Sequence, residues 1–253
     1  MRLAIPNNII YDKLVENVNQ AQLPEPVEIF RVEESRCLDF LINNRVSAAL
    51  LSPIGYGKEL IRTDLRIIPG PMIALHGFTQ TASIIFKKNL FTINKVISPF
   101  PDDFLMIIGK ILLAERYNIF TKITKNLDSN KLLSEDFDCI ITYSKHEYSS
   151  SSLDISEDWH DTYQQPLPLG FWVCKAAETP ENIEAILNSI AVPSLTEFQV
   201  IEENIHSSEH EARRGKIIYQ WNEEIESALE HTFHILFYHQ ILNDIPGVKM
   251  LEE

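Results

Sequence analysis

The N-terminal sequence LAIPNNIIYDKLVENV, residues 3–18, joins a short apolar run to a segment of helical period. We predict a strand at Leu3–Pro6. Asn7 or Asn8 can cap the helix that follows, whose apolar residues recur three or four positions apart and so form one face. Strands that alternate with helices are typical of an α/β fold. The alternation continues with predicted strands at 27–32 and 47–52 and a predicted helix at 34–43.

Two proline-containing segments divide the rest of the chain. Pro-Gly-Pro at 69–71 follows a predicted strand at 65–69, and Gln164–Gly170 precedes another at 171–175. We interpret both segments as crossings between two α/β lobes, with a ligand cleft between the lobes. The predicted lobes comprise residues 1–71 plus 172–253 and residues 72–171.

Further elements are predicted from the same two patterns, short apolar runs for strands and apolar residues three or four positions apart for helices. A surface loop is expected at 149–157, where serines and acidic residues gather. No internal repeat of fixed period is present in the sequence. The remaining predictions are strands at 72–75, 82–86, 95–98 and 139–143, a helix begun by Pro101, and helices at 178–190, 195–211 and 216–242.

Composition narrows the classes of function. The 253-residue chain has a formal net charge of −14, which argues against a nucleic acid or an anionic membrane as the main partner. The most apolar run, 104–114, contains Lys110. It has about half of the roughly 20 residues that cross a bilayer, so no transmembrane span is predicted. The N-terminal sequence lacks a signal-peptide pattern, and we expect a cytoplasmic protein.

Several common chemistries lack support. Cys37, Cys139 and Cys174 are odd in number and lie in apolar runs, so we expect three reduced, buried thiols. The sequence has no Gly-rich phosphate loop and no Gly-x-Ser-x-Gly elbow. These patterns therefore favour neither nucleotide binding nor serine-hydrolase chemistry.

Two histidine pairs have spacings that could hold a metal ion. His206 and His210 belong to an H-x-x-E-H pattern, and His231 and His234 share a predicted helical face. A solvated helix face explains the first pair and packing or capping explains the second. We therefore predict neither a metal nor a cofactor.

Four short segments follow one another in a distinctive order. Pro6-Asn7 follows the first strand, Ser52-Pro53 follows the third, Gly-Phe-Thr-Gln-Thr at 77–81 follows the first crossing, and 138–175 contains Trp159 and Leu-Pro-Leu-Gly. In order and spacing these segments resemble the futalosine-pathway menaquinone biosynthesis family. That family includes chorismate dehydratase and 1,4-dihydroxy-6-naphthoate synthase.

The resemblance implies a type II periplasmic-binding-protein-like fold in which mixed sheets are flanked by helices. It also implies a cytoplasmic location, no metal or redox cofactor, and small polar residues at strand ends that hold a carboxylated substrate. Residue type alone favours a helix cap for either asparagine and a turn residue for the serine, and the ordered resemblance supports the binding role beside these. The matching positions are Asn7, Asn8, Ser52, Thr79 and Thr81.

Two departures from the family pattern bear on the chemistry. Asp102-Asp103-Phe104-Leu105 stands where the dehydratase branch has Ser-x-Thr-Ser, and carboxylates at a helix start repel an anionic ligand. Ser144-Lys145 stands where the naphthoate-synthase branch has His-Glu, and His146 is displaced by two residues. Lys145 could instead offer a cation to an acidic ligand. No catalytic residue is assigned.

Two functions follow as hypotheses. The first is a menaquinone-pathway lyase that breaks a carbon–oxygen or carbon–carbon bond in a chorismate- or futalosine-derived carboxylate. The second is a non-catalytic protein that binds a small carboxylate or an aromatic acid on the same scaffold. Neither a nucleic acid nor a membrane is expected as partner, a homodimer is compatible with both hypotheses, and an interaction protein built on the acidic C-terminal helices is least favoured.

Overall fold

The chain forms two compact units, described by a computed structural model. Unit 1 comprises Met1–Leu75, Leu167–Gln199 and Ile217–Glu253, and unit 2 comprises His76–Pro166 and Val200–Lys216. The structure describes residues 1–59, 62–87, 90, 92–125, 137–143, 152–203 and 212–251.

The bounds of the units differ from those of the predicted lobes in three segments. Residues 72–75 and 167–171 belong to unit 1 and not to unit 2, and residues 200–216 cluster with unit 2. Because strand pairing brings the last of these segments to the chain around Phe78, its neighbours in space differ from its neighbours in sequence. The ligand cleft between the lobes stays a prediction.

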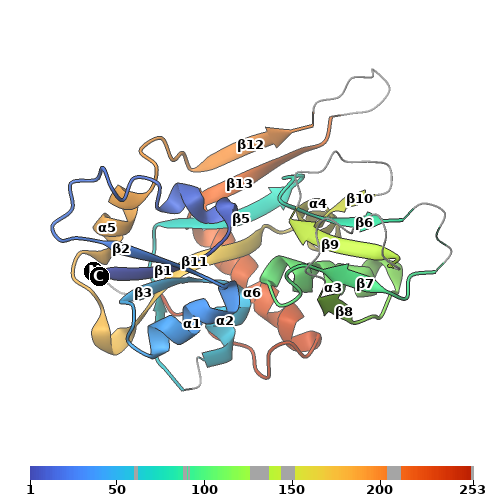
Figure 1. Cartoon of the computed structure of the whole chain (residues 1–253), viewed down its shortest axis with the longest axis horizontal. Coiled ribbons are helices and arrows are strands. Elements are labelled where there is room, and N and C mark those ends of the chain that lie inside the picture. The colour runs from blue at the N-terminus through green and yellow to red at the C-terminus, as the bar shows by residue number, and fades with distance from the viewer. Residues whose placement is uncertain are drawn as a thin grey trace. The chain divides into compact units, whose positions relative to one another are not determined.

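Among the described residues, one sheet has eight strands in the order β12-β13-β5-β11-β3-β1-β2, with β4 also paired to β11 (Figure 1). β1 is parallel to β2 and β3, whereas β11 is antiparallel to β3, β4 and β5. Its strands are β1 (Arg2–Pro6), β2 (Glu28–Val32), β3 (Ala48–Leu51), β4 (Leu65–Ile67), β5 (Pro71–Gly77), β11 (Leu167–Lys175), β12 (Phe198–Glu202) and β13 (Arg214–Gln220).

Helices cover the buried strands of unit 1. α1 (Glu34–Ile42) contacts β1 and β3, while α2 (Pro53–Glu59) and α6 (Glu223–Tyr238) contact β11. The Tyr56 ring of α2 stacks on Phe233 of α6 and meets the edge of Phe171 in β11. Such aromatic packing supplies a large share of the apolar burial that holds a domain together. The other helical segments of unit 1 are η1 (Ile9–Leu14), η3 (Ala176–Glu178) and α5 (Ile183–Ile190).

Unit 2 is built on a second sheet, which has five strands among the described residues, in the order β10-β6-β9-β7-β8. β7 is parallel to β8 and β9, and β6 is antiparallel to β9 and β10. α3 packs closely on β9, since a Cβ added at Gly109 would lie 2.9 Å from Ile141. The elements are β6 (Ala82–Phe86), β7 (Val96–Ser98), α3 (Phe104–Tyr117), β8 (Ile123–Lys125), β9 (Cys139–Tyr143), β10 (Ser152–Asp154) and α4 (Ile155–Tyr163).

Three sequence predictions are wrong. We expected a helix at 195–211, but this segment contains the strand β12. We also expected a helix at 216–242, but the first part of that segment belongs to the strand β13. Sheet pairing outweighs helical periodicity in both segments, which contain β-branched residues. α6 begins only after Asn222, whose side chain accepts the N–H of Ile225 at 2.9 Å. The loop expected at 149–157 instead contains β10 and the start of α4 in its described part.

The predicted state of the cysteines is confirmed. Cys37, Cys139 and Cys174 are unpaired and fully buried. Burial raises the pKa of Cys139 to about 12 and also raises the pKa of Cys174. Neither of these two thiols is therefore disposed to act as a nucleophile near neutral pH. In the part of the chain that the structure describes, no helix is long and apolar enough to cross a membrane.

Candidate functional site

The first group of predicted site residues lies where β1 and β3 end in unit 1. The two parallel strands pair with Leu3 opposite Ala48, so the continued register places Asn7 opposite Ser52. Parallel strands point their carboxyl ends to one edge of the sheet, and ligands of open α/β sheets bind at that edge. Two residues far apart in the sequence therefore lie on neighbouring strand ends.

The two asparagines after β1 have different roles. The backbone N–H of Asn7 donates to the Val32 carbonyl at 2.7 Å, which holds the chain beside β2. Its side chain is exposed, and no hydrogen bond engages it within the described ranges. The Asn8 side chain instead accepts the N–H of Ile10 at 3.1 Å and caps η1. Asn7 therefore has a free amide for a ligand, and Asn8 has the capping role.

Ser52 is buried at the start of α2. Its side-chain oxygen accepts the N–H of Gly55 at 3.4 Å, and its carbonyl accepts the N–H of Tyr56 at 3.0 Å. The long contact to Gly55 uses only a lone pair of the hydroxyl. The Ser52 proton can therefore be donated to another acceptor.

The second group lies in the connection between β5 and β6 of unit 2. The Thr79 hydroxyl is 2.9 Å from that of Thr81 and 2.6 Å from that of Ser156. The Ser156 hydroxyl is 2.8 Å from the Gly77 carbonyl and 2.7 Å from Oδ1 of Asp154. The four side chains are buried, so these bonds form a closed polar network.

The number of hydroxyl protons determines which group donates and which accepts in each hydrogen bond of this network. Each hydroxyl has one proton, and a carbonyl or a carboxylate oxygen can only accept. Ser156 therefore donates to Asp154 or to the Gly77 carbonyl, Thr79 donates to Ser156, and Thr81 donates to Thr79. The network uses all three protons. In this arrangement Thr79 and Thr81 offer lone pairs, which suit a donor better than a carboxylate.

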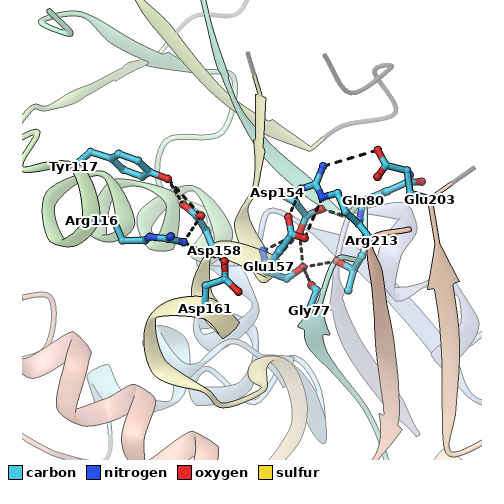
Figure 2. A network of polar contacts seen from close by, with 12 residues as sticks. Gly77, Gln80, Arg116, Tyr117, Asp154, Glu157, Asp158, Asp161, Glu203 and Arg213 are labelled. Atoms are coloured by element: carbon cyan, nitrogen blue, oxygen red, sulfur yellow. Dashed lines mark hydrogen bonds and ion pairs between the residues drawn. The ribbon is translucent and has the colours of Figure 1, made fainter. Parts of the chain in front are cut away.

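Asp154 joins this network to the start of α4 (Figure 2). Its Oδ1 accepts the backbone N–H groups of Ser156 and Glu157 at 3.1 and 3.0 Å. Its Oδ2 accepts the N–H of Gln80 at 2.8 Å. A carboxylate at a helix N-terminus is stabilised by these donors and by the helix dipole. One buried carboxylate therefore holds the 79–81 connection against α4.

Arg213 lies beside the same network. Its guanidinium is 4.2 Å from the centre of the Phe78 ring and forms a bidentate ion pair with Glu157. The hydrogen bond with Glu157 raises the pKa of Arg213 above its ordinary value. Glu203 lies 4.0 Å away on the other side (Figure 2). Because these carboxylates balance its charge, Arg213 is poorly suited to bind an anionic ligand.

Glycines allow the backbone around Phe78 to pack this tightly. Phe78 donates its N–H to the Arg214 carbonyl at 3.1 Å. A Cβ added at Gly215 would lie 2.1 Å from the Phe78 carbonyl oxygen, a distance that no side chain tolerates. Gly77 has φ +67, a conformation that glycine adopts without strain. These contacts fix the connection that contains Thr79 and Thr81.

A second ionic cluster joins α3 to α4 in unit 2. Arg116 donates to Asp158 at 2.5 Å and lies 3.5 Å from Asp161, and the Tyr117 hydroxyl is 3.2 Å from Asp158 (Figure 2). Burial raises the pKa of Asp158 above its ordinary value, while the Arg116 charge acts in the opposite direction. Burial also raises the pKa of Tyr117 to about 12. This cluster has the features of a packing contact between helices.

The structure thus brings the predicted residues together in two groups. The continued register of β1 and β3 places Asn7 opposite Ser52 in unit 1, and the Thr79 and Thr81 hydroxyls are hydrogen-bonded to each other in unit 2. The prediction that all four converge on one cleft stays a prediction. Lys145 lies outside the described residues. The two aspartates stand at the start of α3 as expected, with Asp103 as the N-cap residue.

The sequence analysis missed three residues of the unit 2 network. An N-cap signal was available, because Asp154 precedes Glu157 by three residues, as in the capping boxes that open helices. Ser156 follows from that cap once it is recognised. Arg213 had no local signal, since its partners come from distant segments.

The metal patterns have different outcomes. His206 and His210 lie outside the described residues. His231 and His234 lie on α6, where burial first and the His234 charge second lower the pKa of His231. Within the described ranges, no group of three or more His, Cys, Asp or Glu side chains is placed to hold a metal ion.

Several solved structures resemble the fold. Protein AF1704 from Archaeoglobus fulgidus is 12% identical with a TM-score of 0.63, and the match covers 95% of this chain and 98% of that one. An ABC transporter from Parabacteroides distasonis is 9% identical with a TM-score of 0.61, over 100% and 98% of the two chains. The alkanesulfonate-binding protein SsuA from Xanthomonas axonopodis pv. citri, bound to MOPS, is 11% identical with a TM-score of 0.53, over 98% and 96%.

At these identities the similarity concerns the fold alone. The chain has a two-unit, type II periplasmic-binding-protein-like fold with mixed sheets flanked by helices, so the predicted fold class is confirmed. No protein-family model matches the chain, and no curated protein matches it.

Proposed function

We propose that the protein binds a small carboxylate or aromatic acid at the carboxyl ends of β1 and β3. The observation behind this proposal is the register of the parallel strands β1 and β3, which, continued past the strand ends, places Asn7 opposite Ser52. The carboxyl edge of parallel strands is the usual ligand position in such sheets. An α/β scaffold of the periplasmic-binding-protein type is suited to this function.

The donors at this edge support an acidic ligand. The Asn7 amide has two N–H groups, and the Ser52 hydroxyl retains its proton while accepting from Gly55. A carboxylate accepts such bonds, and bonds to a charged group contribute about 1.5–3 kcal/mol. The unit 2 hydroxyls lack this advantage, since their protons are used within their own network.

Binding can be tested with chorismate and 4-hydroxybenzoate as probes, by thermal shift and isothermal titration calorimetry. Asn7→Ala and Ser52→Ala should each weaken binding roughly tenfold, as expected for the loss of a bond to a carboxylate. Asn8→Ala is the matched control, because it removes a neighbouring amide that caps η1. The proposal fails if neither probe gives saturable binding to the folded protein, or if the control weakens binding as much as Asn7→Ala does.

The family resemblance favours a more specific proposal, a menaquinone-pathway lyase. Its reaction would remove a proton next to an electron-withdrawing group and expel an oxygen leaving group, with water excluded from the site. Incubation with chorismate and with cyclic dehypoxanthine futalosine, followed by mass spectrometry, tests this activity. Absence of product from both would leave the binding function alone.

The same resemblance carries the expectation of a cytoplasmic location, and a homodimer is proposed as compatible with either function. The three unpaired cysteines favour a reducing compartment. Cell fractionation tests the location, and sedimentation equilibrium of the purified chain tests the oligomeric state.

A further inference from the structure

Two aromatic side chains stand at the carboxyl ends of β7 and β9 in unit 2. These parallel strands pair with Val96 opposite Cys139, so the continued register places Phe100 opposite Tyr143. Their ring centroids are 5.8 Å apart, with the planes tilted by 56°. The pair therefore occupies, in the second sheet, the type of edge at which open α/β sheets bind ligands.

The Phe100 ring is presented to solvent by an ordered turn. Its backbone N–H donates to the buried Ser98 hydroxyl at 3.1 Å, and its carbonyl accepts the N–H of Asp103 at 3.1 Å. The side chain is nevertheless 51% exposed, whereas Phe104, the first residue of α3, is fully buried. A large apolar ring held in a fixed, half-exposed position is a ready surface for another ring.

Negative charge lies beside this aromatic pair. The Tyr143 hydroxyl donates to Oδ2 of Asp103 at 3.1 Å, and Asp102 is exposed one residue earlier. Carboxylates at this position repel an anionic ligand and attract a cation, and aromatic faces also attract cations. The charge and the rings therefore favour the same class of ligand.

We propose that Phe100 and Tyr143 form a binding site for an aromatic amine, with its ring against Phe100 and its ammonium group toward Asp103. This proposal uses residues of unit 2 only, whereas the proposal at Asn7 and Ser52 uses residues of unit 1. Stacking on an aromatic side chain contributes enough for its removal to weaken binding about tenfold.

Tryptamine and indole-3-acetate are suitable probes, since they share a ring and differ in the sign of their charge. Titration calorimetry of the full chain should show saturable tryptamine binding that Phe100→Ala weakens about tenfold. Phe120→Ala is the matched control, because Phe120 is 78% exposed in the same unit but follows α3. This control should leave the affinity unchanged.

The charge preference is tested separately. Wild-type protein should bind tryptamine at least about fivefold more tightly than indole-3-acetate. Asp103→Asn should bring this ratio of affinities closer to one. Asp103 makes no side-chain capping bond to α3, and a circular dichroism melt checks that each variant is folded. An unchanged ratio in Asp103→Asn overturns the assignment of the ammonium group.

The whole site is overturned if tryptamine shows no saturable binding, or if Phe100→Ala and Phe120→Ala have equal effects. Asn7→Ala and Ser52→Ala should leave tryptamine binding unchanged. If these two variants weaken tryptamine binding and Phe100→Ala does not, the unit 2 site fails while the unit 1 proposal survives. If they leave chorismate binding unchanged, the unit 1 proposal fails without affecting the unit 2 site.

Discussion

Ser52 in unit 1 and Thr79 in unit 2 are both buried hydroxyl residues that follow a strand, yet their protons have different uses. The Ser52 oxygen accepts a long bond from a backbone N–H and keeps its proton available. The Thr79 proton is committed to Ser156, in a chain that ends at Asp154 or the Gly77 carbonyl. Buried hydroxyls that follow a strand therefore differ in whether their proton is available, and only that of Ser52 suits the binding role proposed above.

The largest expected effect concerns the packing behind Thr79. Gly215→Ala should destabilise the protein by about 3 kcal/mol or prevent folding, because the added methyl group overlaps the Phe78 backbone. Gly247→Ala is the control, since a Cβ at Gly247 meets nothing within 4 Å. Urea unfolding of both variants measures the difference. Similar stabilities would show that the Phe78 contact is not needed.

A smaller effect is expected from the two helix caps. Asp154→Ala removes three backbone bonds and one hydroxyl bond from unit 2 and should cost about 2–3 kcal/mol. Asn8→Ala removes one bond from unit 1 and should cost about 1 kcal/mol. Equal losses in thermal or urea unfolding would contradict the view that unit 2 uses its polar groups for stability.

Substitution of a hydroxyl residue in each unit should distinguish an effect on folding stability from an effect on ligand binding. Ser156→Ala leaves the Thr79 proton without its acceptor and should cost about 1–2 kcal/mol without changing chorismate affinity. Ser52→Ala should cost about 0.5 kcal/mol, since it loses one long bond, but should weaken chorismate binding. Paired unfolding and calorimetry experiments distinguish the two roles. A loss of affinity in Ser156→Ala would place unit 2 hydroxyls in the ligand site.

The smallest expected effect concerns the pH dependence of folding stability. One aspartate in each unit contributes to it, and the two contributions have opposite signs. Burial raises the pKa of Asp158 in unit 2, so the folded state holds its proton more tightly than the unfolded state. Stability from this group therefore falls as pH rises from the ordinary carboxyl pKa of about 3.9 to the raised value. Bonds from Lys249 and Arg66 lower the pKa of Asp64 in unit 1, so its contribution is lost as pH falls.

Unfolding curves between pH 3 and 7 test this contrast. As pH rises, the free energy of unfolding of Asp158→Asn should increase relative to that of wild type. For Asp64→Asn it should decrease relative to that of wild type. The effect of Asp64 should be minor because the group is exposed and screened. Parallel pH profiles for wild type and Asp158→Asn would show that burial of Asp158 has no effect on its protonation.

Local patterns predicted the strands that are mostly buried, because continuous apolar runs leave few alternatives. The predicted strands at 82–86 and 139–143 match β6 and β9 at both ends. Prediction failed for β12. Four of its five residues are exposed, so no buried apolar run marks it, and it forms a strand because it pairs with β13. Among the site residues, the sequence also left open which asparagine caps the first helix.

The sequence by itself determined the α/β alternation, the acidic balance and the buried thiols, since these depend on residue type and short-range spacing. Tertiary structure decided which polar groups are free, because a hydrogen bond between Thr79 and Ser156 joins positions 77 residues apart. It also placed Asn7 opposite Ser52 and Phe100 opposite Tyr143, through the registers of parallel strands that no local pattern specifies. Long-range pairing fixes where protons and rings point, and the chemistry of a binding site depends on those directions.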